Sequence, residues 1–138
     1  NACDVSFLDF ELSGLAYRGF DIAKLFRAIE PIPFNQNNYN AFLAAYTDET
    51  IRLMGSSPSL STLRDEMKSC LPLEAQIMLP LTWLEAAIFF LCSSSVDPLN
   101  SEKWNEMASK RLESYGKYIG EFECHAEAYY EMMKRKQK

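Results

Sequence analysis

The sequence predicts an α+β fold that is predominantly α-helical and begins with a short strand or hairpin. Residues 5–10 form a short apolar run with β-favouring side chains, which is typical of a strand. After residue 20, apolar residues recur every three or four positions, which is the spacing of helices that pack on a core. With 138 residues, 48% of them hydrophobic, the whole stretch 1–138 is predicted to be one domain.

Prolines and small polar residues divide the helical part. Pro31 and Pro33 end the first helix, residues 55–58 end the second, and Ser59 or Ser61 caps a short third helix. A loop is expected at 93–98. We therefore expect helices over residues 20–29, 37–54, 61–67, 73–94 and 101–119, and then a helical tail over 119–138.

The composition excludes several classes of protein. Lys and Arg total 14 against 19 Asp and Glu, and this net charge of -5 is unsuited to neutralising nucleic-acid phosphates. The apolar run 77–92 contains Pro80 and Glu85 and is shorter than the roughly 20 residues of a membrane span. We therefore expect a buried core helix there, with no membrane span and no nucleic-acid partner.

The cysteines indicate a reducing compartment. They stand at positions 3, 70, 92 and 124 without C-x-x-C spacing, and His125 is the single histidine, so neither a zinc site nor a disulfide framework is expected. Cys70 and Cys92 have apolar neighbours and are predicted to be small buried residues. We expect a cytoplasmic protein.

Acidic residues form the first candidate sites. Asp9 and Glu11 follow the predicted strand, and two neighbouring carboxylates can bind a hard dication such as Mg²⁺. The alternative is that they are ordinary acids at a strand end. Asp21 stands at a predicted helix start, where it would complement the positive end of the helix or hold a neighbouring loop.

Trp83, Trp104 and Met107 form a further candidate site. Aromatic faces can surround a cation, although aromatic residues at helical spacing are also typical of a core. Glu85 lies within the apolar run and would face water, pair with Arg111 or touch a polar ligand.

Taken together, these motifs resemble the choline/ethanolamine kinase family, within the aminoglycoside-phosphotransferase-like kinases. D-F-E begins at Asp9 and Y-R-G-F-D-I at Tyr17, and W-x-x-M-A-x-x-R-x-x-x-Y begins at Trp104 after the Ser-rich stretch that follows Trp83. The resemblance covers about residues 5–118. It implies the C-terminal lobe of a protein-kinase-like fold, with the ATP-binding lobe and the catalytic loop upstream.

The resemblance also implies a role for each matching residue and implies Mg²⁺ and ATP as the cofactor and co-substrate. It assigns metal binding to Asp9 and Glu11, substrate binding to Trp83, Trp104 and Met107, and structural roles to Arg18, Asp21 and Arg111. The catalytic base is expected upstream of this stretch.

From this resemblance we expect the substrate-binding lobe of an ATP-dependent kinase. The acceptor would be a hydroxyl of choline, ethanolamine or a similar amino alcohol, and the lobe would be inactive without its N-terminal partner lobe. Ala86 and Met107 stand where the family has aromatic residues, which leaves the acceptor open. Three alternatives remain. The first is a homoserine-type or other related kinase, the second a non-catalytic helical interaction module derived from a kinase, and the third a plain helical domain whose motifs match by chance. A dimer is compatible with each of them.

Overall fold

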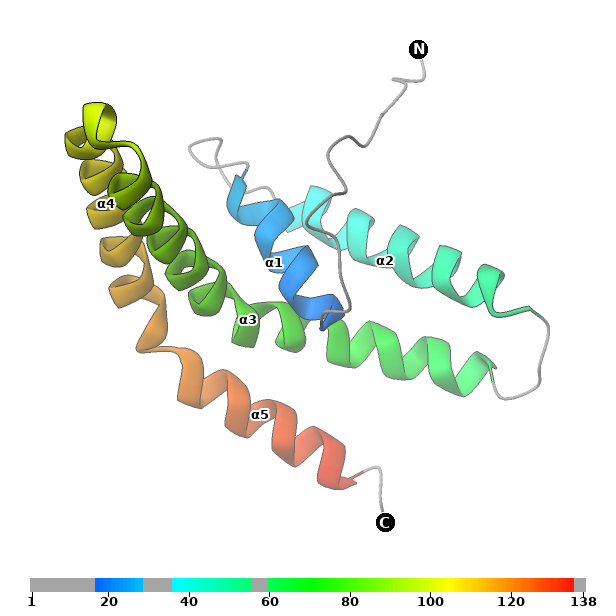
Figure 1. The fold of residues 1–138 in the computed structure, drawn as a ribbon. Coiled ribbons are helices and arrows are strands. Elements are labelled where there is room, and N and C mark those ends of the chain that lie inside the picture. Colours follow the sequence, from blue (N-terminus) through cyan, green and yellow to red (C-terminus); the bar gives the residue numbers. More distant parts are fainter. Residues whose placement is uncertain (1–16, 29–35, 56–59, 136–138) are drawn as a thin grey trace.

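The structure is a computed structural model that describes residues 17–28, 36–55 and 60–135 (Figure 1). No strand occurs in these residues, and the predominantly helical part of the predicted fold is confirmed. The predicted strand at 5–10, with Asp9 and Glu11, lies outside the described residues. The elements are α1 (Arg18–Ala28), α2 (Gln36–Leu53), α3 (Leu60–Val96), the short 3-10 helix η1 (Pro98–Asn100), α4 (Ser101–Ile119) and α5 (Phe122–Arg135).

Helix α3 is one continuous helix of 37 residues, and the predicted break between residues 67 and 73 was wrong. A proline inside a helix removes one hydrogen bond and crowds the preceding turn, which bends the helix and need not end it. Leu71 and Ala75, on either side of Pro72, are almost fully buried, so packing on both sides offsets the lost bond. Figure 1 shows α3 changing direction near its middle.

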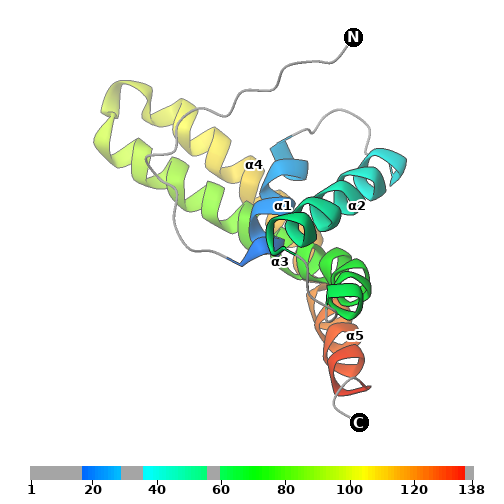
Figure 2. The same ribbon diagram turned by 90° about the vertical axis from the view of Figure 1, so that its right-hand side faces the viewer.

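The other helices all pack against α3. Helix α2 lies on the first half of α3 and α1 lies on its middle. Helix α4 runs back along the second half of α3 after the turn at η1. In Figures 1 and 2 the paired ends of α3 and α4 project away from α2. Helix α5 also contacts α3.

The core lies where α1, α2 and α3 meet. The ring of Phe26 on α1 makes edge-to-face contacts with Tyr39 and Phe42 on α2, at centroid distances of 4.7 and 5.2 Å. Edge-to-face pairs of this kind contribute about 0.5–1.5 kcal/mol beyond the burial of their area. The buried members of the cluster are Ile22, Tyr39, Leu43, Leu71 and Ala75.

The second half of α3 is buried on one side only. Trp83 and Ala87 are buried, but Ile88 and Phe89 are 52% and 57% exposed. Cys92 is also exposed, so its predicted burial was wrong, because α4 covers a single face of this part of α3. The expectation of a fully buried core helix therefore holds for only one face.

Helix α3 is also apolar over a considerable length. Within the described residues, Ser61–Val96 is the one helical stretch whose length and composition would allow it to cross a membrane, and it contains an 18-residue window with a mean hydropathy of 1.6. Only 28% of that apolar window is buried inside the structure. Length and composition are shared by membrane spans and by long core helices, so the absence of a span stays a prediction.

Candidate functional site

The predicted metal ligands Asp9 and Glu11 lie outside the described residues. Among the residues that are described, no group of three or more His, Cys, Asp or Glu side chains is arranged to hold a metal ion. The predicted Mg²⁺ site therefore stays a prediction.

Arg18, the first residue of α1, is joined to Glu74 in the middle of α3. Its Nε lies 2.6 Å from Oε2 and its Nη2 2.7 Å from Oε1, which is the two-pronged geometry of a strong arginine–carboxylate pair. The hydrogen bonds to Glu74 raise the pKa of Arg18 further above its usual value. The Tyr129 hydroxyl on α5 donates a longer hydrogen bond of 3.4 Å to the same carboxylate. Three helices therefore meet at Glu74.

Gly19 explains how closely α1 approaches α3 at this point. A Cβ atom on Gly19 would lie 2.7 Å from the backbone carbon and oxygen of Glu74, which is too close for any other residue without movement of the helices. Asp21 follows in the first turn of α1 and is exposed, where a carboxylate complements the positive end of the helix. The R-G-F-D segment thus has a structural explanation in the anchoring of α1.

Trp83 lies in the middle of α3 and is only 1% exposed. Its ring has the guanidinium carbons of Arg27 and Arg111 at 5.4 and 5.1 Å from its centroid, and the parallel ring of Tyr118 at 6.4 Å. We call these four residues the Trp83 cluster. Two cations of the protein itself therefore lie at the ring that the resemblance assigns to the substrate.

The surroundings of the Trp83 cluster carry an excess of positive charge. Glu85, whose role the sequence left open, pairs with α1: its carboxylate lies 2.8 Å from Lys24 Nζ and 3.5 Å from Arg27 Nη1. Arg111 has no ion pair with any described residue. Burial lowers the pKa of Arg27, partly offset by Glu85, and the charge of Arg111 lowers it further. Lys24 and Arg27 thus share one carboxylate, and Arg111 adds a third positive charge without a carboxylate of its own among the described residues.

Trp104 and Met107 lie on α4, beside a different part of α3 from the part that carries Trp83. The ring of Trp104 stacks on Phe90 at 5.9 Å, and its Nε1 donates a hydrogen bond of 3.2 Å to Asp97. Phe90 follows Trp83 by about two turns of α3, roughly 10 Å along the axis. Met107 is half-buried. The structure therefore does not bring the two tryptophans around one ligand position.

Asp97 closes the connection between α3 and α4. Its Oδ2 accepts hydrogen bonds from Asn100 Nδ2, at 2.8 Å, and from Trp104 Nε1. These donors, Asn100 first, hold the pKa of the carboxyl below its usual value.

Sequence reasoning missed Glu74 and Arg27. Glu74 stands within the apolar segment 71–79, and a carboxylate there needs a partner once the helix is packed. Arg27 lies in the last turn of α1, which is the ordinary place for a basic residue on a helix. The sequence could therefore have indicated a role for Glu74. It does not distinguish Arg27 from an ordinary basic residue at a helix end.

Comparisons with protein-family models, with curated proteins and with solved structures each found no match for this chain.

Proposed function

We propose that this chain is the C-terminal, substrate-binding lobe of an ATP-dependent kinase that phosphorylates a hydroxyl of a small molecule. One observation supports this more than the others. Two segments that carry the resemblance pack on α3, which itself carries Trp83: residues 17–22 contact Glu74 through Arg18 and Gly19, and α4 places Arg111 over the Trp83 ring. Motif residues that lie far apart in the sequence therefore meet on one helix.

In this proposal, Asp9 and Glu11 hold Mg²⁺ against the phosphates of ATP. The ion neutralises charge that develops as the γ-phosphoryl group passes to the acceptor hydroxyl. The base and the phosphate-binding lysine come from the N-terminal lobe and the catalytic loop, as the resemblance implies. The anchor at Arg18 and Gly19 follows the D-F-E motif by only a few residues, so it fixes the point from which that segment departs.

The positive charges around Trp83 affect which acceptor alcohol can bind there. A quaternary ammonium such as that of choline would approach a ring already flanked by Arg27 and Arg111, and like charges repel. A neutral or zwitterionic alcohol avoids this cost. Of the acceptors that the resemblance allows, we therefore favour the homoserine type over choline and ethanolamine.

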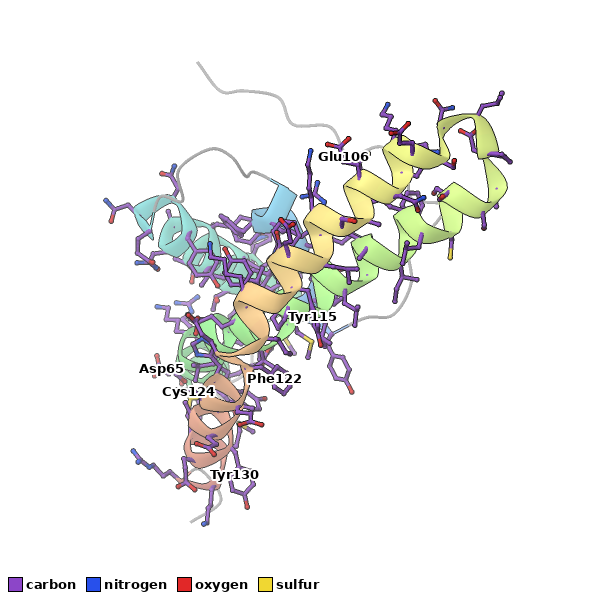
Figure 3. The ribbon with its side chains drawn as sticks, turned by 90° about the vertical axis from the view of Figure 1, so that its left-hand side faces the viewer. Asp65, Glu106, Tyr115, Phe122, Cys124 and Tyr130 are labelled. Atoms are coloured by element: carbon purple, nitrogen blue, oxygen red, sulfur yellow. The ribbon has the colours of Figure 1, made fainter. Side chains whose placement is uncertain are left out.

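The test is phosphate transfer by the longer protein that includes the preceding coding sequence. Wild-type protein is expected to transfer phosphate from Mg²⁺-ATP to an alcohol in a panel of choline, ethanolamine, homoserine and related compounds. Asp9→Asn is expected to abolish the transfer, whereas Asp65→Asn, which changes an exposed acid on α3 (Figure 3), leaves it intact. A folded wild-type protein that phosphorylates none of these alcohols, or an Asp9→Asn variant with full activity, contradicts the proposal.

A helical interaction module is the second candidate. The far end of α3 and the short helix η1 that follows it expose a group of large apolar side chains, which is typical of a surface that contacts another molecule. The group consists of Ile88, Phe89, Leu91, Val96 and Leu99. This candidate predicts that Phe89→Ser reduces concentration-dependent self-association in sedimentation experiments and that no alcohol is phosphorylated.

A further inference from the structure

A cavity lies beside the Trp83 cluster, where α1, α2 and α3 meet the end of α4, and Arg27 and Tyr118 belong to both the cluster and the cavity wall. Its volume is about 410 Å³, within the range of about 300–1,000 Å³ typical of small-molecule sites. Neither tryptophan lines it. Apolar and aromatic side chains form most of its wall, including Ala23, Phe26, Tyr39, Ala75, Leu79 and Tyr118.

The polar residues of this cavity include both signs of charge. Arg27 is the one cationic side chain among the described lining residues, and Glu121 is the one anionic side chain. Three neutral amides, Gln36, Asn40 and Gln76, complete the polar lining. The cavity therefore combines an apolar body with one positive group, one negative group and neutral hydrogen-bonding groups.

One edge of the Arg27 guanidinium has no hydrogen-bond partner among the described residues. Its Nη1 donates to the carbonyl of Thr82 and faces Glu85, while Nε and Nη2 make no hydrogen bond with any described residue. The Nε–Nη2 edge of a guanidinium presents two parallel N–H groups that match the two oxygens of a carboxylate. Because the side chain is only 13% exposed, these donors have lost most of their water. An unpaired donor in such a place is costly unless a ligand supplies an acceptor.

A second cavity of the structure differs from the first because its polar side chains are already paired with one another. It is lined by Arg18, Glu74 and Tyr129, among other residues, and there the cation, the carboxylate and the hydroxyl are bonded to one another. Its polar groups are therefore satisfied within the protein, and the cavity beside Arg27 is the better candidate for a ligand.

We propose that the cavity beside Arg27 binds a small amino acid with an apolar side chain. The carboxylate of the ligand pairs with the Nε–Nη2 edge of Arg27, its ammonium faces Glu121, and its side chain lies on the aromatic rings of Phe26, Tyr39 and Tyr118. The proposal concerns binding alone and does not depend on kinase activity.

Three matched probes test it by calorimetry with the whole chain. L-phenylalanine carries both charged groups, 3-phenylpropanoate carries only the carboxylate, and 2-phenylethylamine carries only the ammonium. L-phenylalanine is expected to bind most tightly, 3-phenylpropanoate more weakly, and 2-phenylethylamine most weakly. No binding of L-phenylalanine to folded wild-type protein overturns the proposal, and so does binding of the amine as tight as that of the amino acid.

Three variants locate the site. Arg27→Gln is expected to weaken L-phenylalanine binding by roughly 10- to 100-fold, as expected for a lost charged hydrogen-bonded pair. Arg111→Gln is the control, because it removes the other cation of the Trp83 cluster and does not line the cavity. Glu121→Gln changes a side chain that is 71% exposed, so the fold should tolerate it, and it should weaken L-phenylalanine but not 3-phenylpropanoate.

Circular dichroism checks that each variant is folded. Should Arg27→Gln fail to fold, Glu121→Gln with the two acidic probes still decides the matter. Unchanged L-phenylalanine affinity in folded Glu121→Gln contradicts the placement of the ammonium. Equal losses in Arg27→Gln and Arg111→Gln contradict the placement of the carboxylate.

Discussion

Arg18 and Glu74 are 56 positions apart in the sequence and form a two-pronged ion pair that ties the start of α1 to the middle of α3. Glu74→Gln is expected to lower the free energy of unfolding by about 1–2 kcal/mol, because Arg18 then keeps a partly buried charge without a carboxylate. Urea denaturation measures this change. The control is Glu49→Gln, which breaks an exposed pair with Arg52 and should have little effect. Equal effects of the two substitutions would show that the Arg18 pair adds no more than a surface contact.

Gly19 and Gly116 should respond in opposite directions to the same substitution. Gly19→Ala forces a Cβ against the backbone of Glu74 and is expected to destabilise the protein by about 1–3 kcal/mol. Gly116 lies within α4 with nothing within 4 Å of the added atom, so Gly116→Ala should stabilise by roughly 0.5–1 kcal/mol. Thermal unfolding of both variants gives the two signs. A Gly19→Ala variant as stable as wild type would contradict the close approach of α1 to α3.

The two tryptophans should differ in their contribution to stability. Trp83 is fully buried, and Trp83→Ala is expected to cost about 3–5 kcal/mol. Trp104 is half-buried, so Trp104→Ala should cost clearly less. Chemical denaturation of both variants makes the comparison. A small loss at Trp83 would indicate that this ring serves a ligand more than the core.

Protonation of Asp97 at low pH should weaken the connection between α3 and α4. Its hydrogen bonds hold the pKa of the folded carboxyl below the usual 3.8, so its contribution to stability is present above that pH. That contribution is lost as the pH falls through the lower pKa of the folded state. The indole N–H resonance of Trp104 is expected to report this titration in NMR spectra, and Asp97→Asn removes it. A titration midpoint at or above 3.8 would run against the expected direction.

Local sequence patterns predicted most of the helices but not how long each one runs. The spacing of apolar residues marked α1, α2 and α4 to within a few residues, because that spacing is set by each helix alone. A break was predicted between residues 67 and 73, but the helix continues through Pro72 because residues distant in the sequence bury both adjoining turns. Proline chemistry is local, but the energy that outweighs it comes from tertiary packing.

The sequence predicted several residues of the candidate site but not which residues contact one another. Trp83, Arg18 and Arg111 were all singled out by motif. Their partners were not, because Glu74 and Arg27 become neighbours of these residues only when helices far apart in the sequence pack together. No spacing rule within one helix reports on such a pair.

Helix α3 is the common partner of all four other α-helices. Opening of one of these helices leaves the others in contact with α3, whereas loss of α3 leaves all of them without their main contact surface. Backbone amides in the buried part of α3, from about Cys70 to Ala87, should therefore exchange with solvent only when the whole protein unfolds. Amides of α5, which packs at one end of the molecule, should exchange through smaller and more frequent openings, so a map of exchange rates along the chain would show α3 as the last element to be released.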